Sequence, residues 1–366
     1  MKPSLRFPEF TDDWSTKKIG DILTIGNGRD YKHLGEGDIP VYGTGGYMLS
    51  VDDYLYEGES VAIGRKGTID KPQFLSGKFW TVDTLFYTRD YVDSCPRFVF
   101  EIFNNINWQR YNEATGVPSL SKSTIEKVKV NIPSKQEQEK IAEFLTAVDE
   151  RIELTSRKVE KLEAYKRGLT QKIFTRTLRF KRDDGSDFPE WETTKLGDIV
   201  DKGFINMGRG MVISATDVDA NPGEYPIYSS SVKNNGLFGR YGNYMFDSEM
   251  ITWSIDGGGD FFYRPTHRFS ITNVSGFIKV IDENLVDTKF LASQLQYLQG
   301  RQVFDYTTKA HPSVICNIYT LGMPLIEEQQ KIAAFLSQID EKITLETQKL
   351  EELKKFKKAL LQRMFV

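Results

Sequence analysis

An internal repeat is the feature of this 366-residue chain that most limits its possible folds. The first match has an offset of 177 residues (191 minus 14) and pairs Trp14, Lys18, Ile19, Gly20, Asp21 and Ile22 with Trp191, Lys195, Leu196, Gly197, Asp198 and Ile199. The second has an offset of 191 residues (324 minus 133) and pairs Pro133, Glu137, Gln138, Lys140, Ile141, Ala142, Phe144, Leu145, Asp149 and Ile152 with Pro324, Glu328, Gln329, Lys331, Ile332, Ala333, Phe335, Leu336, Asp340 and Ile343. Repetition on this scale predicts two tandem copies of one structural unit.

The two copies differ between these matches. Residues 39–42 resemble residues 225–228, and the Phe-Pro-Glu of residues 7–9 recurs at residues 188–190. The offset grows by 14 residues (191 minus 177) from the first match to the second, and such insertions usually lie in surface loops. A duplication with similar ends and a different middle indicates a common scaffold with two different binding surfaces.

A heptad pattern of apolar residues runs through the end of each copy. In the first copy it consists of Ile141, Leu145, Val148, Ile152, Val159, Leu162, Leu169 and Ile173, and in the second of Ile332, Leu336, Ile339, Ile343, Leu350, Leu353, Leu360 and Met364. Lys166 and Lys357 interrupt the two patterns at the same place. Such a pattern predicts a long helix that packs along another helix. Because one chain holds two matching helices, we expect them to pair with each other, and homodimerisation is the alternative.

The segments before the helices have the composition of mixed α and β structure. Strands are predicted at residues 60–64, 79–87, 250–255 and 269–280, and helices at residues 96–111 and 287–302. The predicted class is α/β (α+β), with two tandem domains, each followed by a long helix. The two helices are expected to pair as an antiparallel coiled coil with internal pseudo-twofold symmetry. The predicted segments are a first domain at 1–133, a central helix at 134–177, a second domain at 178–323 and a C-terminal helix at 324–366.

Charge and composition limit the classes of function. The formal net charge of −3 argues against a uniformly basic nucleic-acid-binding surface, so any contact with DNA must come from local patches or from a partner. Cys95 and Cys316 stand far apart, which suits a reducing compartment. The sequence contains neither a signal-peptide pattern nor an apolar run long enough to cross a membrane, so we expect a cytoplasmic protein.

Several loops carry residues suited to DNA contact. Arg65 and Lys66 stand between Gly64 and Gly67, and this pattern allows the backbone to approach a phosphate or a groove closely. The other candidates are Arg29, Tyr31, Lys32 and Lys122 in the first copy and Lys233, Asn234 and Asn235 in the second. A tight turn with solvated charges explains each loop equally well.

The junction between the copies is rich in cations. Arg157, Lys158, Lys161, Lys166, Arg167, Lys172, Arg176, Arg179, Lys181 and Arg182 stand there with only Glu160 and Glu163 among them. This segment could contact DNA or an acidic partner, and a solvated helix face is the alternative.

Patterns that would indicate an enzyme are absent from the sequence. It contains no nucleotide-binding phosphate loop, and His33, His267 and His311 stand apart from one another and from the cysteines. We therefore expect neither a metal site nor a catalytic site. An enzyme whose active-site residues converge from distant positions remains the alternative.

The motifs together resemble the specificity subunit of type I restriction-modification systems. The resemblance covers nearly the whole chain and is most specific at Pro133 to Ile152 and Pro324 to Ile343. It implies that each variable domain is a target recognition domain for one half of a split DNA target, and that the helices set the gap between the halves. It also implies docking of two methyltransferase (modification) subunits and, through them, of ATP-dependent restriction subunits.

The resemblance assigns S-adenosylmethionine, ATP and magnesium to those partner subunits and leaves this chain noncatalytic. One departure is that the second copy lacks a counterpart of Arg65 and Lys66 in residues 256–260, so contacts cannot be transferred between the halves. The alternative functions are a coiled-coil scaffold or adaptor without DNA contact and an unrecognised DNA-modifying enzyme.

Overall fold

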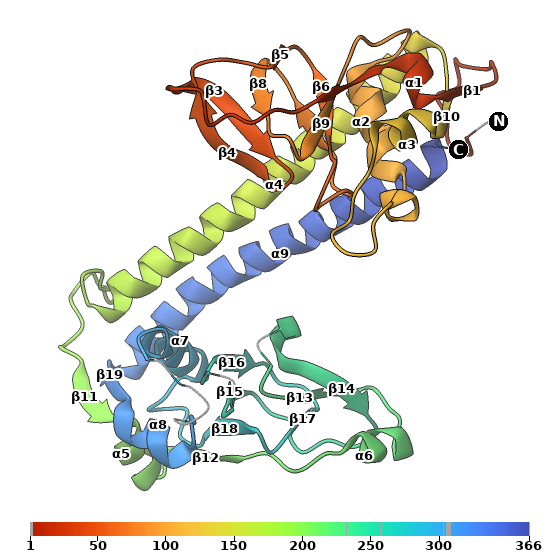
Figure 1. Ribbon diagram of the computed structural model, residues 1–366. Coiled ribbons are helices and arrows are strands. Elements are labelled where there is room, and N and C mark those ends of the chain that lie inside the picture. The colour runs from red at the N-terminus through yellow and green to blue at the C-terminus, as the bar shows by residue number, and fades with distance from the viewer. Residues whose placement is uncertain (1–2, 232, 257, 303, 305–308, 366) are drawn as a thin grey trace. The chain divides into compact units, whose positions relative to one another are not determined.

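The chain forms two compact units in the computed structural model, which describes residues 3–231, 233–256, 258–302, 304 and 309–365 (Figure 1). The first unit contains Met1–Arg157 and Thr347–Val366, and the second contains Lys158–Glu346. Each unit consists of one globular domain and parts of two long helices, α4 (Lys135–Phe174) and α9 (Ile326–Met364). Both helices therefore contribute to both units, whereas the sequence predicts a separate segment for each helix.

The first domain contains two four-stranded sheets and a separate strand pair. One sheet has the order β2 (Thr24–Asn27), β9 (Leu85–Arg89), β6 (Ser60–Gly64) and β7 (Gln73–Leu75), and the other has the order β4 (Gly46–Val51), β3 (Glu36–Gly43), β8 (Lys78–Thr81) and β5 (Tyr56–Glu57). The pair is β1 (Ser15–Lys18) with β10 (Lys129–Ile132), and the helices are α1 (Ile19–Ile22), α2 (Pro96–Asn105), η1 (Trp108–Tyr111) and α3 (Lys122–Lys127). All strand pairs are antiparallel except β3 with β8.

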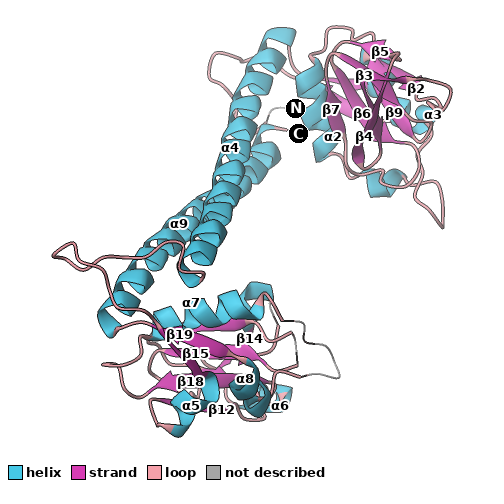
Figure 2. Cartoon of the chain, turned by 90° about the vertical axis from the view of Figure 1, so that its left-hand side faces the viewer, coloured by secondary structure: helices cyan, strands magenta, loops and turns pink. Residues whose placement is uncertain are grey.

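The second domain repeats this topology, with an isolated bridge between Phe246 and Phe269 where the first domain pairs β5 with β8. One sheet has the order β12 (Ile205–Arg209), β18 (Ser275–Val280), β15 (Met250–Ser254) and β16 (Phe261–Arg264). The other has the order β14 (Leu237–Tyr241), β13 (Tyr225–Tyr228) and β17 (Ser270–Ile271). The strand pair is β11 (Glu192–Lys195) with β19 (Thr320–Met323), and the helices are α5 (Leu196–Asp201), α6 (Ala215–Ala220), η2 (Lys233–Gly236), α7 (Thr288–Gln299) and α8 (Pro312–Ile318). Helix α7 lies over the larger sheet (Figure 2). The predicted tandem domains of mixed α and β structure are confirmed.

Two predicted strands are each divided in the structure. Residues 79–87 form the end of β8 and the start of β9, which belong to different sheets, because the Leu85 amide donates to the Val82 carbonyl (2.9 Å) and closes a turn. Residues 269–280 divide in the same way into β17 and β18 around a turn that Ser275 closes on Thr272 (2.9 Å). A continuous apolar run therefore does not show where the chain passes from one sheet to the other.

The long helices pack against each other and into the domain cores. In the first unit, Leu360 and Met364 of α9 share a core with Ile141 and Leu145 of α4, so the end of one helix lies against the start of the other. In the second unit, Ile173 near the end of α4 shares a core with Ile332 and Leu336 at the start of α9. Within each unit the two helix segments are therefore antiparallel.

The heptad residues differ in their burial. Ile141, Leu145, Val148, Ile332, Leu336 and Ile339 are buried, whereas Ile152, Leu162, Ile343 and Leu353 are half-buried. The least exposed heptad residues lie near both ends of each helix, where they share a core with a globular domain; Ile173, Leu360 and Met364 belong to this set. None of the described helices combines the length and the apolar character that crossing a membrane requires.

Candidate nucleic-acid interface and the junctions that position it

A buried carboxylate in the first turn of α4 joins the first domain to its helix. The Glu137 side chain is only 1% exposed. Arg6 donates to its two carboxylate oxygens from Nε (2.6 Å) and Nη2 (2.7 Å), and Trp14 Nε1 donates to Oε1 (3.2 Å). A charged, bidentate pair that is shielded from water has a fixed geometry, so it orients the start of the domain on the helix.

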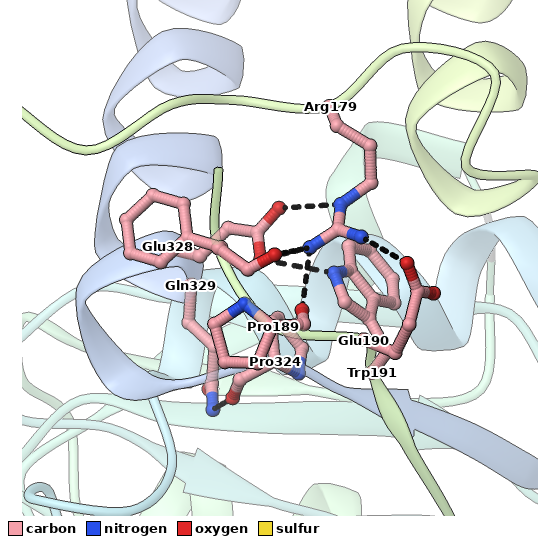
Figure 3. A network of polar contacts seen from close by, with 8 residues as sticks. Arg179, Pro189, Glu190, Trp191, Pro324, Glu328 and Gln329 are labelled. Atoms are coloured by element: carbon pink, nitrogen blue, oxygen red, sulfur yellow. Dashed lines mark hydrogen bonds and ion pairs between the residues drawn. The ribbon is translucent and has the colours of Figure 1, made fainter. Parts of the chain in front are cut away.

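The second unit has the same junction. Glu328 of α9 is fully buried and accepts hydrogen bonds from Arg179 Nε (3.1 Å), Arg179 Nη2 (3.0 Å) and Trp191 Nε1 (3.1 Å), as Figure 3 shows. Arg179 also donates to Glu190 (3.2 Å) and to the Pro189 carbonyl (2.7 Å). The two unlike domains are therefore attached to the long helices by one arrangement of side chains.

The sequence did not reveal the role of the two arginines at these junctions, because Arg6 was not a candidate and Arg179 was only one of the cations between the copies. The repeat pairs Phe7 with Phe188 by sequence, whereas the structure places Phe7 against Phe144 (ring centroids 5.9 Å apart) and Phe180 against Phe335 (5.5 Å). The signal was available, because residues 5–7 (Leu-Arg-Phe) recur as residues 178–180 at an offset of 173 (178 minus 5). These two tripeptides also begin alike, each with a leucine amide that donates to a carbonyl near the end of a long helix. The bonds are Leu5 to Arg363 (2.9 Å) and Leu178 to Lys172 (3.0 Å).

A glutamine beside each buried glutamate holds a second segment of its domain. Gln138 Oε1 accepts from the Cys95 amide (3.0 Å), directly before α2. Gln329 Oε1 accepts from the Asp287 amide (2.9 Å), directly before α7. Each glutamine also donates to a proline carbonyl at the end of its domain, that of Pro133 (3.0 Å) or Pro324 (2.9 Å). The first turn of each long helix thus fixes three separate parts of the neighbouring domain.

The lysines that interrupt the heptads form ion pairs across the two helices. Lys357 of α9 pairs with Asp149 of α4 (2.7 Å) in the first unit, and Lys166 of α4 pairs with Asp340 of α9 (2.6 Å) in the second. Lys357 also contacts Glu101 of α2 (3.3 Å), whose side chain is 5% exposed. Burial raises the pKa of the Glu101 carboxyl, and the charge of Lys357 opposes this shift. Each pair fixes the register of its two helix segments.

Three of the predicted DNA contacts of the first domain lie around one turn. The backbone amides of Arg29 and Arg65 donate to the carbonyls of Thr81 and Thr84 (2.8 Å each), in the turn between β8 and β9, and Lys66 follows Arg65. All three cations are exposed, and none has an ion pair within the described ranges. The exposed Asp83 belongs to the same turn, so this surface presents both signs of charge.

The other first-domain candidates lie in two different places. Tyr31 and Lys32 line a cleft of about 460 Å³ beside the start of β3. Lys122 forms an ion pair with Glu126 (3.6 Å) one turn later in α3. Its helix begins next to the Arg65 loop, because the Leu120 amide donates to the Arg65 carbonyl (2.9 Å). The structure therefore gathers Arg29, Arg65 and Lys66 and leaves Tyr31 and Lys32 in a cleft of their own.

Equivalent positions in the second domain have different chemistry. The amides of Met211 and Ile255 donate to the Ile271 (3.2 Å) and Val274 (2.9 Å) carbonyls, in the turn that corresponds to the turn between β8 and β9. Met211 thus occupies the place of Arg29, and the buried Ile255 occupies the place of Arg65. Asn234 and Asn235 are exposed in η2, whereas the Lys233 side chain lies outside the described part of the structure.

Half of the ten cations in the cation-rich segment between the copies form ion pairs. Five of its ten cations have carboxylate partners: Arg157 with Glu153, Lys158 with Glu346, Lys166 with Asp340, Arg179 with Glu328 and Lys181 with Asp187. These pairs leave a smaller positive field than the sequence indicates. In the described ranges there is also no group of three or more His, Cys, Asp or Glu side chains placed to hold a metal ion.

Comparisons with known proteins agree with the duplicated architecture. The chain matches the family model of the type I restriction modification DNA specificity domain twice, over residues 11–164 and 189–355. A putative type I specificity subunit of Mycoplasma pneumoniae is 31% identical over 228 residues, which are 62% of this chain and 80% of that relative. The MpnII type I restriction enzyme specificity subunit of the same organism is 34% identical over 155 residues, 42% of this chain and 44% of that protein.

Solved structures resemble this fold. The crystal structure of a type I restriction-modification system S subunit from M. genitalium aligns with a TM-score of 0.73 and covers 100% of this chain and 99% of its own. A chain from a structural study of type I restriction-modification complex assembly aligns with a TM-score of 0.53 over 97% of this chain and 98% of its own. Sequence identities of 16% and 14% limit both likenesses to the fold.

Proposed function

Because the chain belongs to the type I restriction modification DNA specificity family, we propose that each of its domains recognises one half of a bipartite target in double-stranded DNA. The observation that carries this proposal is the pair of equivalent junctions at Glu137 and Glu328, which attach two unlike domains to one helical framework. A protein that acted only as a scaffold would not need different loops on two domains that are attached to the helices in the same way. Two half-sites of different sequence require such an arrangement.

The long helices set the distance between the two half-sites and dock two modification subunits, through which the restriction subunits join. Lys357 with Asp149 and Lys166 with Asp340 support this role, because they hold the register of the helix segments in each unit. A fixed register gives a fixed helix length between the domains.

We further propose that the chain is noncatalytic and acts in the cytoplasm. S-adenosylmethionine, ATP and magnesium then bind the partner subunits, which transfer the methyl group and hydrolyse ATP. The partners also contribute contacts to the DNA phosphates, which a chain with a net charge of −3 needs.

The test is to produce the full chain together with its modification subunits in a cell without other adenine methylation and to sequence the methylated positions. The expected result is one split motif with a constant gap. Methylation at a single uninterrupted motif, or the same motif without this chain, would refute the proposal. Methylation or cleavage of DNA by the purified chain alone would instead favour the enzyme alternative.

A further inference from the structure

The second domain carries apolar and amide groups where the first domain carries cations. Met211 is 56% exposed and replaces Arg29, and its neighbour Val212 is 75% exposed. Single exposed apolar side chains are common on protein surfaces, but here they stand at a position that carries a cation in the first domain. In the major groove, apolar side chains suit the methyl group of thymine, whereas arginine suits guanine.

The turn between β13 and β14 lies beside this apolar position. Met211 forms a β-bridge with Thr272, Thr272 Oγ1 donates to Ser229 Oγ (3.0 Å), and the Ser229 amide closes the turn on the Gly236 carbonyl (2.8 Å). Asn234 and Asn235 in this turn have left-handed φ angles of 51° and 52°. Asparagine adopts this conformation more readily than other non-glycine residues, so the turn holds both side chains without marked strain.

A buried cation lies directly beneath the turn. Arg264 at the end of β16 is 1% exposed, and its Nε donates to Thr252 Oγ1 (2.9 Å). Its guanidinium carbon lies 3.7 Å from the centre of the Tyr228 ring, in the strand that leads into the turn. A Cβ atom on Gly236 would lie 3.1 Å from Arg264 Nη2, so the glycine lets the turn rest on the guanidinium.

Among the residues that the structure describes, none gives the charge of Arg264 an acidic partner. Within the described ranges Arg264 forms no ion pair, and its buried Nη1 has no hydrogen-bond partner. Burial lowers the pKa of its guanidinium to about 10, so the group is still charged at neutral pH. A buried charge without a carboxylate partner makes a fold less stable than an apolar side chain of similar size would, and the Tyr228 ring offsets only part of this cost.

The first domain has an apolar residue at the equivalent position. Arg264 pairs with Met250, the first residue of β15, and Leu75 pairs with Ser60, the first residue of β6. Leu75 is 3% exposed and belongs to the domain core. Gln73, on the same strand as Leu75, donates to the Gly43 carbonyl (2.8 Å) at the turn between β3 and β4. Both domains therefore support this turn from the opposite sheet, but only the second domain does so with a buried charge.

We infer that Asn234 and Asn235 of the second domain contact an adenine of its half-site through their side-chain amides. Asparagine can bind the N6 and N7 atoms of adenine with two hydrogen bonds. Met211 and Val212 contact thymine methyl groups beside it. Arg264 is the positioning residue that holds the turn with the two asparagines. This inference rests on the proposed function and specifies the base chemistry of one domain.

The experiment selects DNA duplexes from a library with two randomised blocks, using the full chain with its modification subunits. Three variants are compared with the wild type: Arg264→Leu, which copies Leu75; the double variant Asn234→Ala with Asn235→Ala; and the double variant Arg65→Ala with Lys66→Ala. A second measurement replaces each selected adenine by 7-deazaadenine, which lacks the N7 acceptor. Thermal unfolding is recorded for every variant.

The expected result is a preference for adenine in one half-site, which falls about 5- to 150-fold in both the Arg264→Leu and the double asparagine variant. The other half-site stays unchanged in these variants and changes only in the Arg65 and Lys66 variant. Substitution by 7-deazaadenine weakens binding of the wild type and has little effect on the double asparagine variant. The Arg264→Leu variant unfolds at the same temperature as the wild type or higher, because it loses an unpaired buried charge.

A folded Arg264→Leu variant with wild-type preferences in both half-sites would overturn the positioning role. Unchanged preferences in the double asparagine variant would overturn the adenine contact. If Arg264→Leu does not fold, the double asparagine variant and the 7-deazaadenine duplexes still test the adenine contact. If the wild type selects no split motif, the proposed function fails, and the inference fails with it. Each proposal therefore has its own contrary result.

Discussion

Substitution of Glu328 by glutamine should destabilise the second unit strongly. The carboxylate of Glu328 is fully buried and accepts three hydrogen bonds, two from Arg179 and one from Trp191. Glutamine has only one acceptor oxygen, and its side-chain N–H groups would face the N–H donors of Arg179 and Trp191. Loss of one partner of a buried pair costs about 3–5 kcal/mol. The Arg179 side chain is 22% exposed and also contacts Glu190, so it can regain water, and we expect about 3 kcal/mol, the lower end of that range.

This free energy corresponds to a large shift of the unfolding temperature. The second unit has 189 residues (346 minus 158, plus 1), and a unit of that size shifts by about 2–4 °C per kcal/mol. The transition that involves this unit should therefore move down by about 6–12 °C. Scanning calorimetry of the full chain measures this shift, and the Glu137→Gln variant is the matched control for the first unit.

A double-mutant cycle with Arg179→Met separates the pair from other effects of the substitution. The double variant should be more stable than the sum of the single losses predicts, by at least about 1 kcal/mol, because the second substitution removes an arginine that has already lost its partner. Additive losses, or a Glu328→Gln variant that unfolds at the wild-type temperature, would refute this account of the junction.

Three further predictions concern other parts of the chain. Because burial raises the pKa of Glu101, the wild type loses stability as the pH rises from the ordinary pKa of this carboxyl to the raised one. The Glu101→Gln variant should therefore be more stable than the wild type at about pH 8 and equally stable at about pH 4. Urea unfolding that shows a less stable variant at both pH values would contradict this. Replacing Arg65 and Lys66 by alanine should weaken binding to one half-site only, and competition binding that shows equal loss at both halves would reject the assignment of this loop to a single half-site. Deleting residues 153–159 together with residues 344–350 shortens both helices by about 10.5 Å and should reduce the gap between the half-sites by about three base pairs. If methylation sequencing finds an unchanged gap, the helices do not set the spacing.

Sequence alone determined the duplication, the long helices and the mixed class of the domains. These features depend on local patterns: the heptads of α4 and α9 extend over more than four repeats, and the matches at offsets of 177 and 191 residues preserve order and spacing. Helix capping is equally local, and the hydrogen bond that Asp287 accepts from the Phe290 amide (2.8 Å) at the start of α7 is an example.

Tertiary structure alone decided which distant side chains meet. Arg6 and Glu137 are 131 residues apart, and Arg179 and Glu328 are 149 apart, so no local pattern pairs them. The equivalence of Arg65 with Ile255, and of Leu75 with Arg264, follows from backbone hydrogen bonds and strand register. The physical reason is that a buried charge depends on the groups folded around it. Residues 6 and 264 are both arginine, but in the described structure only Arg6 lies beside a carboxylate.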